Sequence, residues 1–112
     1  LLDSTVVHWG GEMGRLPVLQ NDAGPEKWGR DHNTYGFSMW VAGGGFKKGH
    51  VHGQTDDFGH KAVLDEVRHF DYHATLLHLF GLDHTRLTYK RNGLAASLTD
   101  NQGAKVITPL LA

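Results

Sequence analysis

Two short apolar runs, each followed by glycines, constrain the fold of this chain more than any other feature of its sequence. Residues 5–9 and residues 37–42 are rich in β-branched and aromatic side chains, and the second run ends in Gly43-Gly44-Gly45. Runs of this kind are typical of short buried strands in a parallel sheet, which need neighbouring strands on both sides. The two runs therefore predict an α/β fold.

The segment that joins these two runs is long and polar. It spans the 27 residues from Gly10 through Gly36 and is rich in Gly, Asp, Asn and Pro. Structureless connections of that length are uncommon in compact domains and are usually functional, so we expect this one to carry function. Residues 43–60 form a second polar stretch with frequent glycines, which we expect to be loop.

One helix is predicted over residues 71–81. Asp71 can accept hydrogen bonds from the amides of the first turn, and Gly81 can adopt the left-handed conformation that ends a helix. Three residues are expected on its buried face: Leu76, Leu79 and Phe80. Four aromatic side chains are expected to pack in the core or against loops: Trp9, Trp28, Trp40 and Phe80.

The end of the chain predicts short strands joined by turns. Asn92-Gly93 is the strongest hairpin signal, because both residues tolerate the positive φ of a two-residue turn. Two parallel-type strands, one helix and a hairpin do not complete an α/β domain. We therefore expect residues 1–112 to be a single partial domain that is part of something larger. Alone, the chain is expected to be unstable or to associate.

Composition excludes several classes of protein. The chain has no cysteine, so disulfides and cysteine-based zinc sites are impossible. Its 11 basic and 12 acidic residues lack the positive excess that binds nucleic acid. Its longest apolar run, residues 39–42, is far too short for a membrane span. The unusual counts are 15 glycines and nine histidines, and histidine-rich chains bind metals, sense pH or carry a catalytic cluster.

The first candidate site directly follows residues 5–9. In open α/β sheets, ligand-binding groups gather on the loops after the strands. Glu12 can be a metal ligand or a base, and Arg15 can grip an anionic oxyacid through its bidentate guanidinium group. The alternative is that Glu12 and Arg15 form an ion pair that only shapes a glycine turn.

The second candidate site, Asp31-His32, lies just before the second apolar run. Where the backbone is irregular, both side chains can reach one cation, or Asp31 can orient the imidazole of His32. Surface loops also carry such pairs by chance. A third candidate is His50 with His52, whose rings would share one side of an extended segment, with His60 near enough to join them. A solvated loop is the alternative there.

These residues carry a resemblance to one family. The chain resembles the C-terminal part of the sulfatase-like family catalogued as domain of unknown function fifteen-oh-one, within the alkaline phosphatase superfamily. The resemblance covers essentially the whole chain, and its motifs are specific in combination. The segments that carry it are residues 5–15, 29–32, 36–45, 53–59, 71–83 and 87–93.

The resemblance implies the C-terminal portion of an alkaline-phosphatase or sulfatase-like sheet, with flanking helices and a terminal hairpin. It implies a metal-assisted hydrolase of sulfate or phosphate esters, acting on a small-molecule or carbohydrate ester with a divalent ion such as Zn²⁺, Ca²⁺ or Mg²⁺. In the superfamily, an Asp-His-Gly motif after a strand supplies metal ligands, as does a later histidine. Glu12 matches that Asp and His32 matches the later His, while Asp31 is available as a further ligand.

One departure from the superfamily pattern leaves the function open. Met13 stands where the superfamily has its second ligand, and a thioether is a poor partner for these ions. The resemblance implies a C-terminal fragment whose partner is the N-terminal portion of the same domain. The nucleophile is expected in that N-terminal portion, so the fragment alone is expected to be inactive. A non-catalytic relative that binds an anionic or carbohydrate ligand is the alternative, and a stand-alone histidine-rich metal-binding domain is a third. Relatives of this kind are exported bacterial proteins, which implies a periplasmic or extracellular location.

Overall fold

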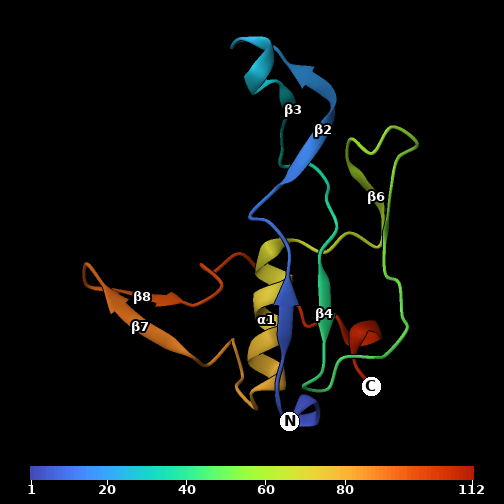
Figure 1. The fold of residues 1–112 in the computed structure, drawn as a ribbon. Coiled ribbons are helices and arrows are strands. Elements are labelled where there is room, and N and C mark those ends of the chain that lie inside the picture. The colour runs from blue at the N-terminus through green and yellow to red at the C-terminus, as the bar shows by residue number, and fades with distance from the viewer.

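The computed structural model describes residues 1–112 and contains one α-helix, eight short strands and three turns of 3-10 helix (Figure 1). In chain order the elements are η1 (Leu2–Ser4), β1 (Val7–Trp9), β2 (Gly14–Gln20), η2 (Pro25–Lys27), β3 (Gly29–Asn33), β4 (Trp40–Ala42), β5 (Gln54–Thr55), β6 (Ala62–Leu64), α1 (His69–Leu79), β7 (Thr88–Arg91), β8 (Leu94–Ser97) and η3 (Thr108–Leu110).

The strands form four separate two-stranded sheets, and all four are antiparallel: β1 with β4, β2 with β3, β5 with β6, and β7 with β8. The expected mixture of helix and sheet is therefore confirmed, but the parallel orientation predicted for the first two strands is wrong. The reason lies in the long connection between them. It folds back on itself as the β2/β3 hairpin, so β4 returns alongside β1 in the opposite direction.

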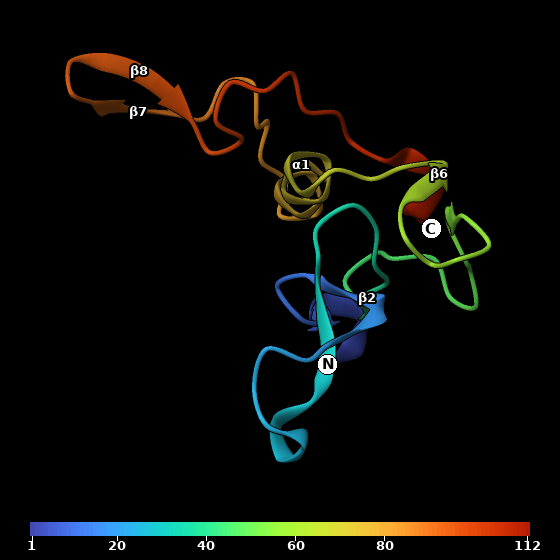
Figure 2. The same cartoon turned by 90° about the horizontal axis from the view of Figure 1, so that it is seen from above.

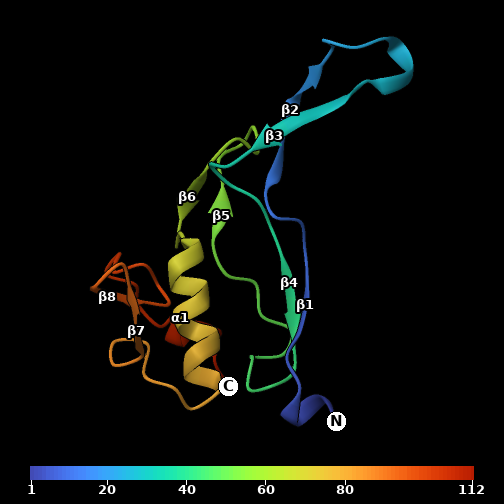
Figure 3. The ribbon, with the colours of Figure 1, turned by 90° about the vertical axis from the view of Figure 1, so that its left-hand side faces the viewer.

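The β1/β4 pair covers one side of α1. His8 and Val41 are cross-strand partners, and the Nδ1 atom of His8 lies 2.6 Å from the hydroxyl of Tyr72 on the helix. Because side chains alternate along a strand, Trp9 and Trp40, which are also cross-strand partners, lie on the face away from α1. Figure 3 shows β1 and β4 along the helix and the β2/β3 hairpin extending beyond its end.

Helix α1 begins at His69, two residues before the predicted start. Asp71 occupies the third helical position rather than the N-cap, which is Arg68, and its carboxylate accepts from the Arg68 amide. The predicted end is confirmed, since Gly81 has a φ of +75°. Of the predicted buried residues, Leu76 and Leu79 are half-buried, whereas Phe80 is 66% exposed.

The buried face of α1 carries small and polar residues instead, namely Asp71, Tyr72, Ala74 and Thr75. The C-terminal segment explains this difference from the prediction. The amide of Lys105 donates to the Asp71 carboxylate at 3.0 Å, and the amide of Ile107 donates to the Thr75 hydroxyl at 3.0 Å. The helix therefore holds an irregular segment whose amides need acceptors, and polar side chains provide them.

The predicted terminal hairpin is confirmed as β7 and β8. Asn92 and Gly93 form its turn with φ values of +52° and +82°, as a two-residue turn of this kind requires. Seen from above in Figure 2, this hairpin extends away from α1 on the side opposite to β1.

The glycines after β4 allow a close chain contact. Gly43 has a φ of +73°, and a Cβ at that position would lie 2.3 Å from the Thr5 carbonyl oxygen. Only glycine fits where the N-terminal segment passes so near, and this contact fixes the beginning of β1 beside the end of β4.

Little of the chain is buried within the structure itself. Nine of the 112 residues are buried, and the accessible surface is 8434 Å², against about 6100 Å² for a compact monomer of 12.4 kDa. The radius of gyration is 16.9 Å, against about 13 Å for a compact domain of this length. Trp9, Trp40 and Phe80 are exposed, so a core role for them within this chain is wrong.

No helix in the structure combines the length and apolar character that spanning a bilayer requires. The single α-helix has 11 residues.

Candidate functional site

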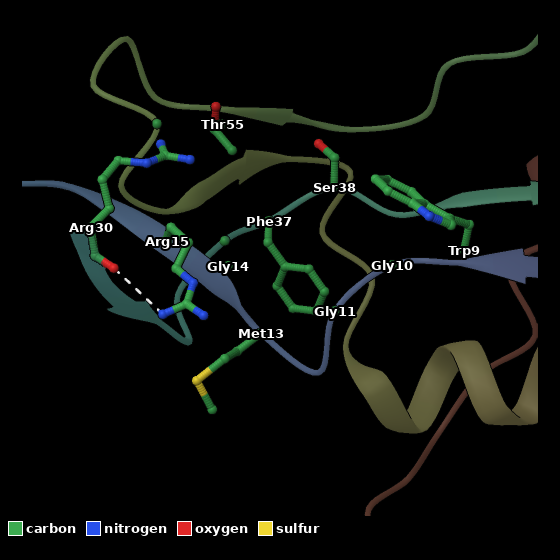
Figure 4. A pocket seen from close by; sticks show the side chains of 12 residues that line it. Trp9, Gly10, Gly11, Met13, Gly14, Arg15, Arg30, Phe37, Ser38 and Thr55 are labelled. Carbon is green, nitrogen blue, oxygen red and sulfur yellow. Dashed lines mark hydrogen bonds between the residues drawn. The ribbon is translucent and has the colours of Figure 1, made fainter. Parts of the chain in front are cut away.

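A pocket of about 500 Å³ lies where β1 leads into β2, at the base of the β2/β3 hairpin (Figure 4). Its size is within the usual range for small-molecule sites. Backbone of five glycines forms part of its wall, together with the side chains of Trp9, Met13, Arg15, Arg30, Phe37, Ser38 and Thr55. Two of the three hydrophobic residues are aromatic, and both charged residues are arginines.

The β2/β3 pairing brings two of the predicted site residues together. Arg15 and His32 are cross-strand partners, so their side chains share one face of the hairpin. Arg30 lies two residues before His32 on β3 and therefore projects from the same face. The Nη1 atom of Arg15 also donates to the carbonyl oxygen of Arg30 at 3.4 Å. Arg15 and Arg30 thus form one cationic edge of the pocket, and His32 lies on the same face of the hairpin without lining the pocket.

Asp31 and Glu12 lie apart from this edge. Asp31 is in a regular strand and projects from the opposite face to His32, and its Oδ1 accepts from the His32 amide at 2.7 Å. Glu12 is exposed, in the turn before β2, and does not line the pocket. The ion pair between Glu12 and Arg15 that sequence left open does not form, because the one salt bridge in the chain joins Arg68 and Asp71.

The predicted metal ligands do not gather into a metal centre. The structure contains no group of three or more His, Asp or Glu side chains placed to hold one ion. Met13, which lines the pocket, offers only a thioether, a soft donor that suits neither Ca²⁺ nor Mg²⁺. The residues of this chain alone therefore do not fit the divalent ion that the resemblance implies.

Glycines position the aromatic wall of the pocket. A Cβ at Gly14 would lie 2.5 Å from the Cβ of Phe37, and a Cβ at Gly36 would lie 2.6 Å from the amide nitrogen of Ala62. Both contacts require glycine, so the segment before β4 approaches the beginning of β2 and the beginning of β6 at backbone distance. Phe37 is held against the start of β2 as a result.

The histidine group predicted in the loop at residues 50–60 assembles only in part. The rings of His50 and His52 lie 6.0 Å apart between centroids, so the two do share one side of the segment. The ring of His60 instead lies 5.5 Å from that of Tyr35. His50 and His52 remain a pair without a third protein ligand.

The sequence assigns no binding role to five side chains of the pocket, those of Trp9, Arg30, Phe37, Ser38 and Thr55. Arg30 adjoins the Asp31-His32 pair, and strand alternation would have placed it on the face of His32 once β3 was recognised. Trp9 ends β1 and was assigned to packing, while Ser38 and Thr55 carried no signal in the sequence. Thr55 reaches the site through the folding of a segment 40 residues beyond Arg15.

Comparison with known proteins identifies the family of the chain. No curated protein and no solved structure matches it. The profile of one family, described as protein of unknown function (DUF1501), matches residues 1–111. That match covers nearly the whole sequence, including every residue of the pocket, and the chain therefore belongs to the DUF1501 family.

Proposed function

We propose that this chain forms part of a sulfatase-like hydrolase that cleaves sulfate or phosphate esters, and that its pocket holds the oxyanion of the ester. The observation that carries the proposal is the presence of two guanidinium groups, those of Arg15 and Arg30, on the wall of one pocket. Guanidinium groups bind planar pairs of oxygen atoms through parallel hydrogen bonds, and sulfate and phosphate groups both present such pairs.

The proposed role of each side chain follows from its position on or beside the β2/β3 hairpin. Arg15 and Arg30 neutralise the charge of the transferring group. His32, the cross-strand partner of Arg15, would hold a metal ion at this edge. Glu12, in the exposed turn before β2, accepts a proton. A divalent ion belongs to the proposal only with ligands from outside residues 1–112, because Asp31 projects from the opposite face to His32 and Glu12 lies apart from both.

The chain acts, in this proposal, as the C-terminal part of a larger alkaline-phosphatase-like domain. This part of the proposal is supported by the large apolar surface that the chain leaves exposed, which includes both tryptophans of the β1/β4 pair. Burial of apolar surface is the main force that stabilises a fold, so further chain is needed to cover this face. The nucleophile would come from that further chain. An exported location in a bacterium belongs to the same proposal and rests on the resemblance.

The proposal is tested by steady-state hydrolysis of 4-nitrophenyl sulfate and 4-nitrophenyl phosphate by the full-length protein. Arg15→Gln is expected to lower kcat about 100-fold, because one group that stabilises the developing charge is lost. Arg91→Gln is the matched control, since Arg91 is exposed on β7, away from the pocket. Glu12→Gln and His32→Ala test the other two roles, and unchanged rates in both would remove them.

A second function is favoured by Met13, which lines the pocket at the position where the superfamily has a metal ligand. It is that of a non-catalytic relative which binds an anionic or carbohydrate ligand. In that case the full-length protein binds sulfate or phosphate esters through Arg15 and Arg30 and releases them unchanged. Binding without release of 4-nitrophenol would favour this function over hydrolysis.

A further inference from the structure

The loop between β4 and β5 holds two imidazole rings side by side. The ring centroids of His50 and His52 lie 6.0 Å apart, with 42° between the ring planes. Val51 between them is 88% exposed, which agrees with an extended segment that projects the two histidines to one side and the valine to the other. Figure 1 shows this green segment on the side of the molecule opposite the β7/β8 hairpin. The pair belongs neither to the pocket at the base of the β2/β3 hairpin nor to the β1/β4 pair.

We propose that His50 and His52 bind a divalent transition-metal ion, with Cu²⁺ held most tightly and Zn²⁺ less so. Each imidazole supplies one nitrogen, and water completes the coordination of the ion. This site goes beyond the proposed function, because it uses no residue of the pocket.

The separation of the two rings fits a shared ion. Bonds of about 2.0 to 2.1 Å between the metal and an imidazole nitrogen place each ring centroid about 3.2 Å from the ion. Two rings on one ion therefore have centroids no more than about 6.4 Å apart. The observed 6.0 Å lies within this limit, so the rings can hold one ion after small rotations, without rearrangement of the backbone.

The backbone is anchored on both sides of the pair. Before it, the Lys47 amide donates to the Leu110 carbonyl oxygen at 2.8 Å. After it, a Cβ at Gly53 would lie 3.1 Å from the Asp65 carbonyl oxygen, so the chain passes close to the end of β6, and Gln54 begins β5. Ligands that are held in place before binding lose less conformational entropy when they bind, and anchoring therefore favours the site.

The chemistry of the donors selects the ion. Residues 46–54 contain no carboxylate, and Lys47 and Lys48 precede the pair, so an ion held mainly by charge, such as Ca²⁺ or Mg²⁺, is disfavoured. Imidazole nitrogen suits Cu²⁺, Ni²⁺ and Zn²⁺, and Cu²⁺ forms the strongest complexes in that series. A site with only two protein ligands depends most on the strength of each bond, which is the reason that Cu²⁺ is expected first.

The test titrates Cu²⁺, Zn²⁺ and Ca²⁺ into the full-length protein after dialysis against a chelator, and isothermal titration calorimetry measures binding. The site is identified by the difference between wild type and variants, since other parts of the full-length protein can also bind ions. His50→Ala and His52→Ala are each expected to weaken Cu²⁺ binding about 10-fold or more, because the second imidazole then no longer adds its high effective concentration. Zn²⁺ should be bound less tightly than Cu²⁺, and Ca²⁺ binding should be the same in wild type and both variants.

His60→Ala is the matched control. His60 lies in the same part of the chain, but its ring is 5.5 Å from that of Tyr35 and not beside the pair. Its replacement is expected to leave Cu²⁺ affinity unchanged. Unchanged affinity in both His50→Ala and His52→Ala would overturn the proposal, and an equal loss in His60→Ala would overturn the assignment to this pair.

Electron paramagnetic resonance of the protein loaded with one equivalent of Cu²⁺ gives a second readout. The wild-type spectrum is expected to show coupling to two imidazole nitrogens, and that of His52→Ala to one. The same nitrogen coupling in both would contradict the site. Arg15→Gln, which tests the proposed function, should leave Cu²⁺ affinity unchanged, so failure of either proposal is distinguishable from failure of the other.

Discussion

Asp71 is a charged residue on which the start of α1 depends. Its side chain is 1% exposed and accepts hydrogen bonds from the Arg68 guanidinium group at 2.9 Å and from the Lys105 amide at 3.0 Å. The Arg68 side chain is the main reason that the pKa of Asp71 falls from 3.8 to about 2, and the Lys105 amide adds to it while burial opposes it. The ionised carboxylate thus joins the helix to the C-terminal segment.

This residue predicts a loss of stability in acid. Because the pKa of Asp71 is lower in the folded state, its contribution is present above pH 3.8 and is lost as the pH falls through about 2. The free energy of unfolding is expected to fall by about 1 to 2 kcal/mol over that interval, with allowance for solvent screening. Urea unfolding followed by circular dichroism at pH 5 and pH 2 measures it.

Two variants isolate the effect of Asp71 from that of other carboxylates. In Asp71→Asn, the free energy of unfolding at pH 5 is expected to be lower than in the wild type. Most of the difference in this free energy between pH 5 and pH 2 is expected to disappear. In Asp57→Asn, which changes an exposed carboxylate, the difference should remain. If wild type and Asp71→Asn lose the same stability on acidification, the assigned role of Asp71 is wrong.

At the scale of elements, the docking of α1 on the C-terminal segment depends on a buried hydroxyl group. The Thr75 hydroxyl donates to the Asp71 carbonyl oxygen at 2.8 Å and accepts from the Ile107 amide at 3.0 Å. Thr75→Val keeps the shape but leaves the buried Ile107 amide without an acceptor, and is expected to lower the free energy of unfolding by about 1 to 3 kcal/mol. Thr75→Ser keeps the hydroxyl and should lose less than half as much. Urea unfolding measures both, and equal losses would contradict the prediction.

Whether an element could be predicted depends on how much of the chain determines its structure. The end of α1 at Gly81 and the Asn92-Gly93 hairpin follow from the conformations of single residues, and both are confirmed. The direction of β4 relative to β1 depends on how 30 intervening residues fold, and an apolar run carries no information about it. A parallel arrangement was therefore inferred from composition, and it was wrong.

In the candidate site, too, some features follow from single residues and others depend on how distant parts of the chain pair. Glu12, Arg15, Asp31 and His32 could be selected from residue type and from their places beside the apolar runs. Which of them share a face depends on the register of β2 and β3, including an irregularity between Arg15 and Leu19 that no local pattern encodes. That register brings Arg15 opposite His32, and it sends Asp31 to the other face.

At the scale of the whole molecule, the face of β1 and β4 that points away from α1 is apolar and uncovered. Val7, Trp9 and Trp40 are 40%, 72% and 56% exposed there. The outer edges of both strands are also unpaired, because each strand pairs only with the other. Exposed apolar surface beside free strand edges promotes association with other chains.

We therefore expect the isolated chain to self-associate through this face. Sedimentation velocity of residues 1–112 at rising concentrations should show oligomers. Trp40→Thr should shift the distribution toward monomer, because it removes apolar area while threonine, like tryptophan, suits a strand. Leu94→Thr is the matched control, since Leu94 is even more exposed than Trp40, at 73% against 56%, but lies on β8 in the hairpin that extends away from α1. A monomer at every concentration, with a cooperative thermal transition independent of concentration, would show that this surface tolerates water and needs no covering chain.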